Sequence, residues 1–146
     1  MTLELYLDNN WIRRHETSRQ EIAELLAIAD RDIGESQTRG LGPEWRFGIA
    51  YNAALQLAAA ALAAAGFLAE RQNKHQRTIE YLAFTIGLER NEVDLLDLCR
   101  RKRHTNLYDQ VGAVSDQEAN EMITLAKHLR AQVETWLKDN HCTLLP

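Results

Sequence analysis

The stretch that decides the fold is Ala53-Ala54-Leu55-Gln56-Leu57-Ala58-Ala59-Ala60-Ala61-Leu62-Ala63-Ala64-Ala65, which holds nine alanines. No charged residue lies between Arg46 and Glu70. Alanine has the highest intrinsic helix propensity, so the stretch predicts one long helix at the centre of the molecule. The uncharged segment between Arg46 and Glu70 is long enough to cross a bilayer. Because alanine contributes little to lipid transfer and Asn52 and Gln56 oppose insertion, we expect a core helix and no membrane partner.

Helix start and stop signals surround this stretch. Pro43 suits the first turn of the alanine-rich helix, and Gly66 suits its end. Ser18 and Ser115 each have a glutamate three residues later, the spacing of a capping box, and each predicts the start of a helix. The remaining apolar periodicity predicts helices over part of residues 3–15, over residues 75–88, and from Asn91 into the run 100–104.

The fold class follows from these helices and their short connections. No run alternates apolar and polar residues for long enough to suggest a strand. Short connections favour antiparallel neighbours. The sequence therefore predicts an all-α protein, a four- to five-helix up-and-down bundle. We expect a single domain over residues 1–146 with the core bundle at about 18–138.

Composition and charge exclude some functions. The chain of 146 residues has 45% hydrophobic and 26% charged residues, as an ordinary globular protein does. Its net charge of −4 argues against a protein whose whole surface grips nucleic acid. Cys99 and Cys142 are the only cysteines and are not expected to pair. Two thiols and no recognisable export signal favour a cytoplasmic protein.

The only dense cationic run is Arg100-Arg101-Lys102-Arg103-His104. On a helix, Arg103 shares the core-facing stripe with Leu96, Cys99 and Leu107. A guanidinium on that side is costly unless it is paired or reached by water. Arg101, His104 and Tyr108 fall on an adjacent face, where they could hold a phosphate. The alternative is a basic helix end that interacts with the helix dipole and reaches into water.

Other site motifs are fewer. His75 opens the helix predicted over residues 75–88 and could reach a polar pocket, although a solvated connector is the alternative. No glutamate is followed by histidine at the spacing of a di-iron site, and no Cys–His cluster offers a zinc site. Gly-rich phosphate loops and nucleophile elbows are also missing. We therefore expect neither a metal nor a cofactor.

Three segments resemble the HEPN superfamily, small helical domains named for nucleotide binding in higher eukaryotes and prokaryotes. The resemblance spans roughly residues 18–138 and rests on segments 50–55, 75–82 and 103–109. It implies a homodimer in which the Arg-bearing helices face a shared cleft. It also implies a role in a toxin–antitoxin, stress or defence system, with a nucleotidyltransferase or an antitoxin as partner.

The family's ribonuclease motif is an arginine followed by a polar residue, with a histidine four to six residues beyond the arginine. Arg103 matches the arginine, His104 takes the polar position, and Tyr108 replaces the distal histidine. A phenol is a poor general base at neutral pH, but it can stack on a base or bond to a phosphate. The departure favours a module that binds RNA or a nucleotide. The candidate ligand-binding residues are Arg100, Arg101, Arg103, His104, Tyr108 and His75.

Two alternatives stay open. One is a metal-independent ribonuclease, in which Arg103 stabilises the developing charge on the phosphate and Tyr108 or His104 transfers the proton. The other is a structural bundle that assembles with a partner protein and binds no ligand.

Overall fold

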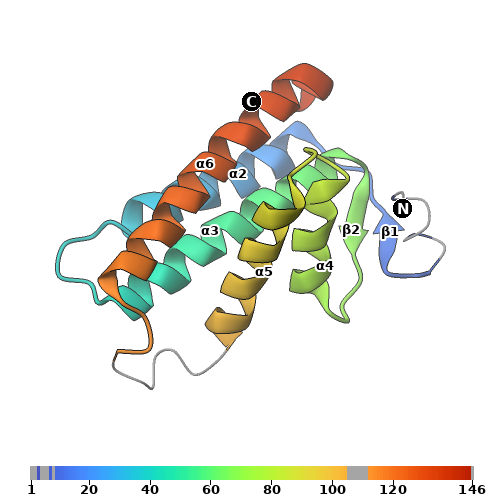
Figure 1. Cartoon of the computed structure of the whole chain (residues 1–146). Coiled ribbons are helices and arrows are strands. Elements are labelled where there is room, and N and C mark those ends of the chain that lie inside the picture. Colours follow the sequence, from blue (N-terminus) through green and yellow to red (C-terminus); the bar gives the residue numbers. More distant parts are fainter. Residues whose placement is uncertain (1–2, 4–6, 8, 105–111, 146) are drawn as a thin grey trace.

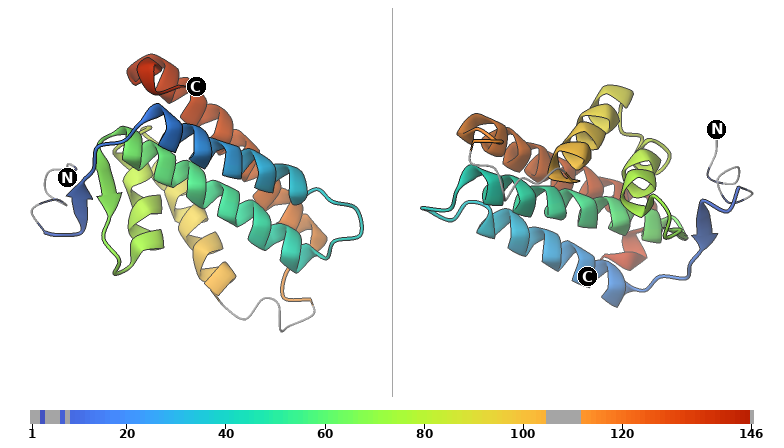
Figure 2. Two further views of the ribbon diagram at one scale, coloured as in Figure 1. Left: turned by 180° about the vertical axis from the view of Figure 1, so that it is seen from behind. Right: turned by 90° about the horizontal axis from the view of Figure 1, so that it is seen from below.

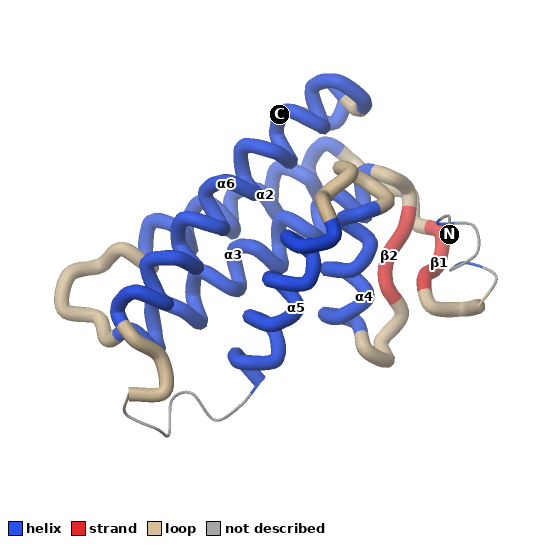
Figure 3. The backbone as a smooth tube through the Cα atoms, viewed as in Figure 1, coloured by secondary structure: helices blue, strands red, loops and turns tan. Residues whose placement is uncertain are grey.

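The computed structural model describes residues 3, 7, 9–104 and 112–145. Within this part of the chain, the helices are α2 (Arg19–Glu35), α3 (Pro43–Ala64), α4 (Lys74–Glu80), α5 (Arg90–His104) and α6 (Asp116–Asn140). Two short strands, β1 (Ile12–Arg14) and β2 (Phe67–Ala69), form a small sheet at one end (Figures 1 and 3). Single 3₁₀ turns cover Tyr81–Ala83 and Cys142–Leu144. The prediction of an all-α bundle is confirmed to the extent that the described part of the chain is mostly helical, with only one small two-stranded sheet.

The alanine-rich helix α3 is the centre of the bundle. It packs along α2 on one side and α6 on the other, and α4 and α5 also contact it (Figure 2). Ala53, Ala60, Ala61 and Ala63 are fully buried. Alanine serves here because helices can approach closely on several sides of α3 only where side chains are small. Of the described helices, α3 alone is long and apolar enough to cross a membrane, and 78% of its most apolar window is buried in the bundle.

Asn52, a polar residue within the apolar part of α3, has a partner inside the bundle. Its amide donates a hydrogen bond of 2.7 Å to the Oδ2 atom of Asp32 on α2. Asp32 is only 4% exposed, and Arg31 pairs with its other carboxylate oxygen at 3.0 Å. Because a buried carboxylate is costly unless it is bonded, this contact explains how α2 and α3 accommodate a polar pair at their interface.

The predicted helix starts are confirmed. The Ser18 hydroxyl accepts a hydrogen bond of 3.1 Å from the Glu21 amide at the start of α2. At the start of α6 the capping box is complete, because Ser115 and Glu118 each accept a bond from the other's backbone N–H, at 3.0 and 3.1 Å. Pro43 occupies the first turn of α3.

The helix expected within residues 3–15 is wrong at its C-terminal end, where residues 12–14 form strand β1. β1 pairs antiparallel with β2, with Ile12 opposite Ala69. Ile12 is 2% exposed and belongs to a small apolar cluster beside the main core. Arg77 covers the neighbouring Trp11, its guanidinium carbon 3.8 Å from the ring centroid. The expectation that the chain has no strands is therefore also wrong. A strand of three residues is too short to show the alternation of apolar and polar residues by which strands are predicted.

The helix expected over residues 75–88 is shorter than predicted. α4 ends at Glu80, and the 3₁₀ turn Tyr81–Ala83 follows. The backbone then turns back at Gly87, whose φ is +72°. The turn buries Leu88, which is 6% exposed, and leads into α5. As a result, α4 and α5 pack side by side.

Candidate anion-binding site

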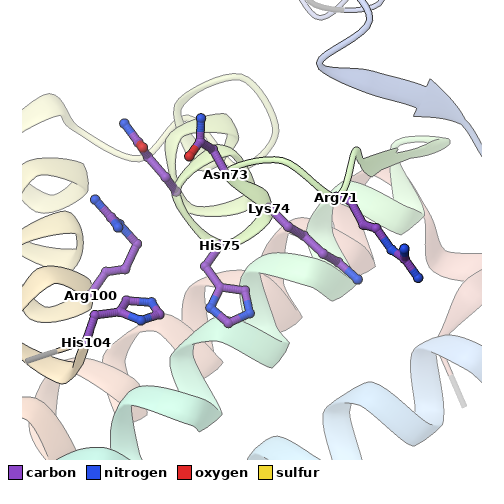
Figure 4. Close-up of a pocket in the computed structure, with 7 residues that line it drawn as sticks. Arg71, Asn73, Lys74, His75, Arg100 and His104 are labelled. Atoms are coloured by element: carbon purple, nitrogen blue, oxygen red, sulfur yellow. The ribbon is translucent and has the colours of Figure 1, made fainter. Parts of the chain in front are cut away.

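A pocket of about 410 Å³ lies between α5, the first turn of α4 and the connector that links β2 to α4. We call it the outer pocket, and its lining residues are Arg71, Asn73, Lys74, His75, Gln76, Arg100 and His104. In Figure 4 the His75 and His104 rings lie next to each other, with Arg100 on the α5 side and Lys74 and Arg71 on the opposite side.

Local structure explains why these residues share a pocket. Asn73 has a left-handed backbone, with φ +56° and ψ +34°, and it turns the connector into α4. The turn brings His75 in the first turn of α4 towards the last turns of α5. There, Arg100 and His104 are four residues apart and therefore lie on the same face of the helix.

The pocket is strongly cationic. Arg71, Lys74 and Arg100 carry permanent positive charges, and none of the described lining residues is acidic. The Nε atom of Arg100 lies 2.8 Å from Oδ1 of Asp97, and the Arg100 side chain is only 18% exposed. Because Asp97 binds Nε, it orients the guanidinium without belonging to the pocket lining. An oriented guanidinium is well suited to bind a phosphate or a carboxylate.

The two histidines form a close pair. Their ring centroids are 5.7 Å apart and the ring planes are inclined by 35°. Burial lowers the pKa of His75, and the charges of His104, Lys74 and Arg100 lower it further. Each of these charges would attract an anion. The charges of Lys74 and Arg100, which contribute to the lower pKa of His75, therefore also favour an anionic ligand.

The structure brings together three of the predicted site residues, namely His75, Arg100 and His104. Arg101 does not line the outer pocket. Its side chain is 61% exposed, and its Nε atom lies 3.4 Å from Oδ2 of Asp97. Tyr108 lies outside the described residues.

Arg103 does not line the outer pocket either. It is half-buried, and the buried Leu96 lies on the same predicted stripe of α5. Burial raises the pKa of Tyr51 on α3, and the charges of Arg100 and Arg103 oppose that rise. The charge of Arg103 therefore reaches the Tyr51 hydroxyl on α3.

Sequence reasoning missed Arg71 and Lys74. The segment Arg71-Gln72-Asn73-Lys74-His75 places two cations directly before a predicted site histidine. That cluster is a usable signal, but its meaning depends on α5, which lies farther along the chain. The folded connector is what turns two ordinary surface cations into lining residues.

Among the described residues, no group of three or more His, Cys, Asp or Glu side chains is placed to hold a metal ion. Comparison of the chain with family models, curated proteins and solved structures gives no match. The HEPN resemblance therefore stays a prediction, and the outer pocket is the structural feature that bears on function.

Proposed function

We propose that the protein binds RNA or a nucleotide through a phosphate group held in the outer pocket. The observation that carries the proposal is the lining itself. Three permanent cations and two imidazoles line one pocket of a protein whose net charge is −4. Concentrating positive charge in one place on an acidic protein favours a local anion-binding site over general adhesion to nucleic acid.

The lining residues suit phosphate in different ways. Arg100 offers a planar fork of N–H donors, and Lys74 offers a compact point charge. His75 and His104 each donate a hydrogen bond when their rings are oriented for it. We expect binding to weaken as salt rises, because phosphate contacts release counterions.

The test compares Arg100→Gln with Arg101→Gln. The two residues are neighbours on α5 and both pair with Asp97, but only Arg100 lines the outer pocket. Fluorescence anisotropy of a labelled single-stranded RNA gives the affinity over a series of salt concentrations. A hydrogen bond to a charged group contributes roughly 1.5–3 kcal/mol, so Arg100→Gln should weaken binding by about tenfold or more. Arg101→Gln should change it less than about twofold.

Equal losses in the two variants would show that the run 100–104 acts through its overall charge, and would refute a specific pocket. An absence of binding to RNA, nucleotides and inorganic phosphate would favour the structural bundle that binds no ligand. Circular dichroism of both variants checks that helicity is retained.

A metal-independent ribonuclease is a second candidate, and the close pair of His75 and His104 favours it. A neutral imidazole can accept the 2′-hydroxyl proton while a protonated one donates to the leaving 5′-oxygen. The protein should then cut RNA even in the presence of a chelator, and it should not cut DNA. His104→Gln should abolish the cleavage of RNA. Cleavage that is unchanged in this variant would come from a contaminant or from another site.

The cellular role, the oligomeric state and the partners of the protein are part of the same proposal. We propose a cytoplasmic HEPN-like homodimer in a toxin–antitoxin, stress or defence system, with a nucleotidyltransferase or antitoxin as partner. The resemblance of segments 50–55, 75–82 and 103–109 supports it. Sedimentation analysis tests the dimer, and a monomer that binds RNA fully would refute the shared cleft.

A further inference from the structure

A second cavity of about 240 Å³ lies next to the outer pocket, between α2, α3, β2 and α4. We call it the inner cavity. Most of its wall is apolar and comes from leucine and alanine side chains, among them Leu25, Leu55, Leu62 and Leu68. Such a wall favours an apolar or aromatic group over a free anion.

Lys74 and His75 line both the inner cavity and the outer pocket. The two hollows are therefore neighbours that share part of their walls, and a ligand that passes these two side chains would reach from one hollow into the other. The inner cavity alone is smaller than the roughly 300–1,000 Å³ typical of small-molecule sites, but the two hollows together fall within that range. A ligand that fills both needs a charged end and a largely apolar end.

We propose that the two hollows form one site for a nucleoside monophosphate, with the phosphate in the outer pocket and the base in the inner cavity. This inference rests on the proposed function and narrows it. RNA threading through a surface groove needs only the outer pocket, whereas a terminal or free nucleotide can place its base inside.

Polar groups in the wall favour a base over an alkyl chain. Glu21, Gln56 and Thr78 line the inner cavity among its apolar side chains. The Thr17 hydroxyl donates one hydrogen bond to Oε1 of Glu21, and this bond lowers the pKa of Glu21 more than burial raises it. The carboxylate is therefore ionised at neutral pH and can accept further hydrogen bonds. The Thr78 hydroxyl already donates to the Lys74 carbonyl, and the Gln56 amide donates to Asn52. An alkyl chain would still take the ionised Glu21 carboxylate out of water without adding a bond to it, which is costly. The edge of a base offers donors and acceptors, while its faces suit leucine.

Isothermal titration calorimetry at one neutral pH and ionic strength tests the proposal. The probes are AMP, GMP, CMP, UMP, ribose 5-phosphate, hexyl phosphate and inorganic phosphate. We expect at least one nucleotide to bind about tenfold or more tightly than ribose 5-phosphate, because base burial adds apolar contact. Ribose 5-phosphate should bind about as tightly as inorganic phosphate.

Variants test whether the difference in affinity between the nucleotide and ribose 5-phosphate comes from the inner cavity. Ala59 is half-buried and lines the cavity, so Ala59→Leu should fill it. The nucleotide should then bind no better than ribose 5-phosphate, while the affinity for inorganic phosphate is unchanged. Ala27→Leu on the exposed side of α2 is the matched control and should change neither affinity. If Ala59→Leu does not fold, Gln56→Leu removes a polar wall group and should also reduce the nucleotide's advantage.

The outcomes separate the inference from the proposed function. If nucleotides and ribose 5-phosphate bind equally, the inner cavity is not used and only the inference fails. If hexyl phosphate binds as tightly as the best nucleotide, the cavity accepts an alkyl chain and the base assignment is overturned. If no phosphate binds at all, the proposed function fails together with the inference.

Discussion

Replacing Leu57 by alanine tests whether α3 is the core of the bundle. Leu57 lies in the middle of α3 and is completely buried, at 0% exposure. Leucine-to-alanine changes in packed cores cost about 2.7–5 kcal/mol, the larger values where neighbours cannot collapse into the cavity. Since α3 is held between α2 and α6 along its length, we expect a value in the upper half of this range.

The expected loss in the free energy of unfolding can be converted into a change in melting temperature. Unfolding entropy is about 2.1 cal/mol/K per residue, or roughly 0.3 kcal/mol/K for this chain of 146 residues. A loss in the upper half of that range should therefore lower the melting temperature by roughly 13–16 °C. That loss is a large part of a typical total stability of about 5–15 kcal/mol, so urea titration followed by circular dichroism should detect it easily.

Leu98→Ala is the matched control. Leu98 lies on α5 and is 54% exposed, so its removal should change stability by no more than about 0.5 kcal/mol. If Leu57→Ala and Leu98→Ala destabilise the protein equally, α3 does not form the core in solution, and the packing argument for its alanines fails.

Three further predictions concern single side chains. Ser115→Ala should lower the free energy of unfolding by about 1 kcal/mol in urea titrations, because it removes the hydroxyl of a complete capping box. Glu21→Gln should destabilise the protein at about pH 7, and this loss of stability should shrink as the pH falls through the folded pKa of Glu21. The Thr17 hydroxyl holds the pKa of Glu21 below 4.5, so its stabilisation exists above that value and is lost as the pH falls through the lower folded pKa. Burial raises the pKa of Cys99 to about 11, so a thiol reagent at about pH 8 should label only Cys142 in the native protein and both cysteines in urea.

Each of these predictions has a control. Thr124→Ala, on the exposed side of α6, should be nearly neutral, and an equal loss there would contradict the capping argument. A Glu21→Gln deficit that persists at low pH would show that packing, and not the charge, was lost. Rapid labelling of two thiols in the native state would contradict the burial of Cys99.

Local signals predicted the parts of the fold that are governed by local chemistry. Ser18, Pro43 and Ser115 act within one turn of their own helices, so the sequence around each was sufficient to place three helix starts. The alanine-rich stretch was equally informative, because small side chains in a run without charges have few alternatives to a central helix.

The errors share a physical cause, which is pairing between distant segments. β1 exists because Ile12 meets Ala69 across the sheet, and neither three-residue strand has a pattern of its own. Likewise, α4 ends at Glu80 because the turn that follows must bury Leu88, not because a proline or glycine interrupts it there.

The candidate site likewise combines features that local sequence predicted with features that depend on distant segments meeting. Helical spacing placed Arg100 and His104 four residues apart, and His75 was already a candidate. That these residues meet depends on α4 packing against α5, which no spacing within either helix predicts. Arg71 and Lys74 were missed because a connector becomes a pocket wall only after the chain has folded.

The little sheet also matters for whoever prepares the protein. The Glu70 amide donates a hydrogen bond of 2.9 Å to the Trp11 carbonyl, directly before the connector that carries Arg71. A shortened recombinant fragment that starts after Arg14 would keep every helix from α2 to α6 and give a normal far-ultraviolet spectrum. It would nevertheless lose β1 and the hydrogen bond between Glu70 and Trp11, which hold the connector that lines the outer pocket. A helical spectrum alone therefore does not show that a shortened protein can bind its ligand.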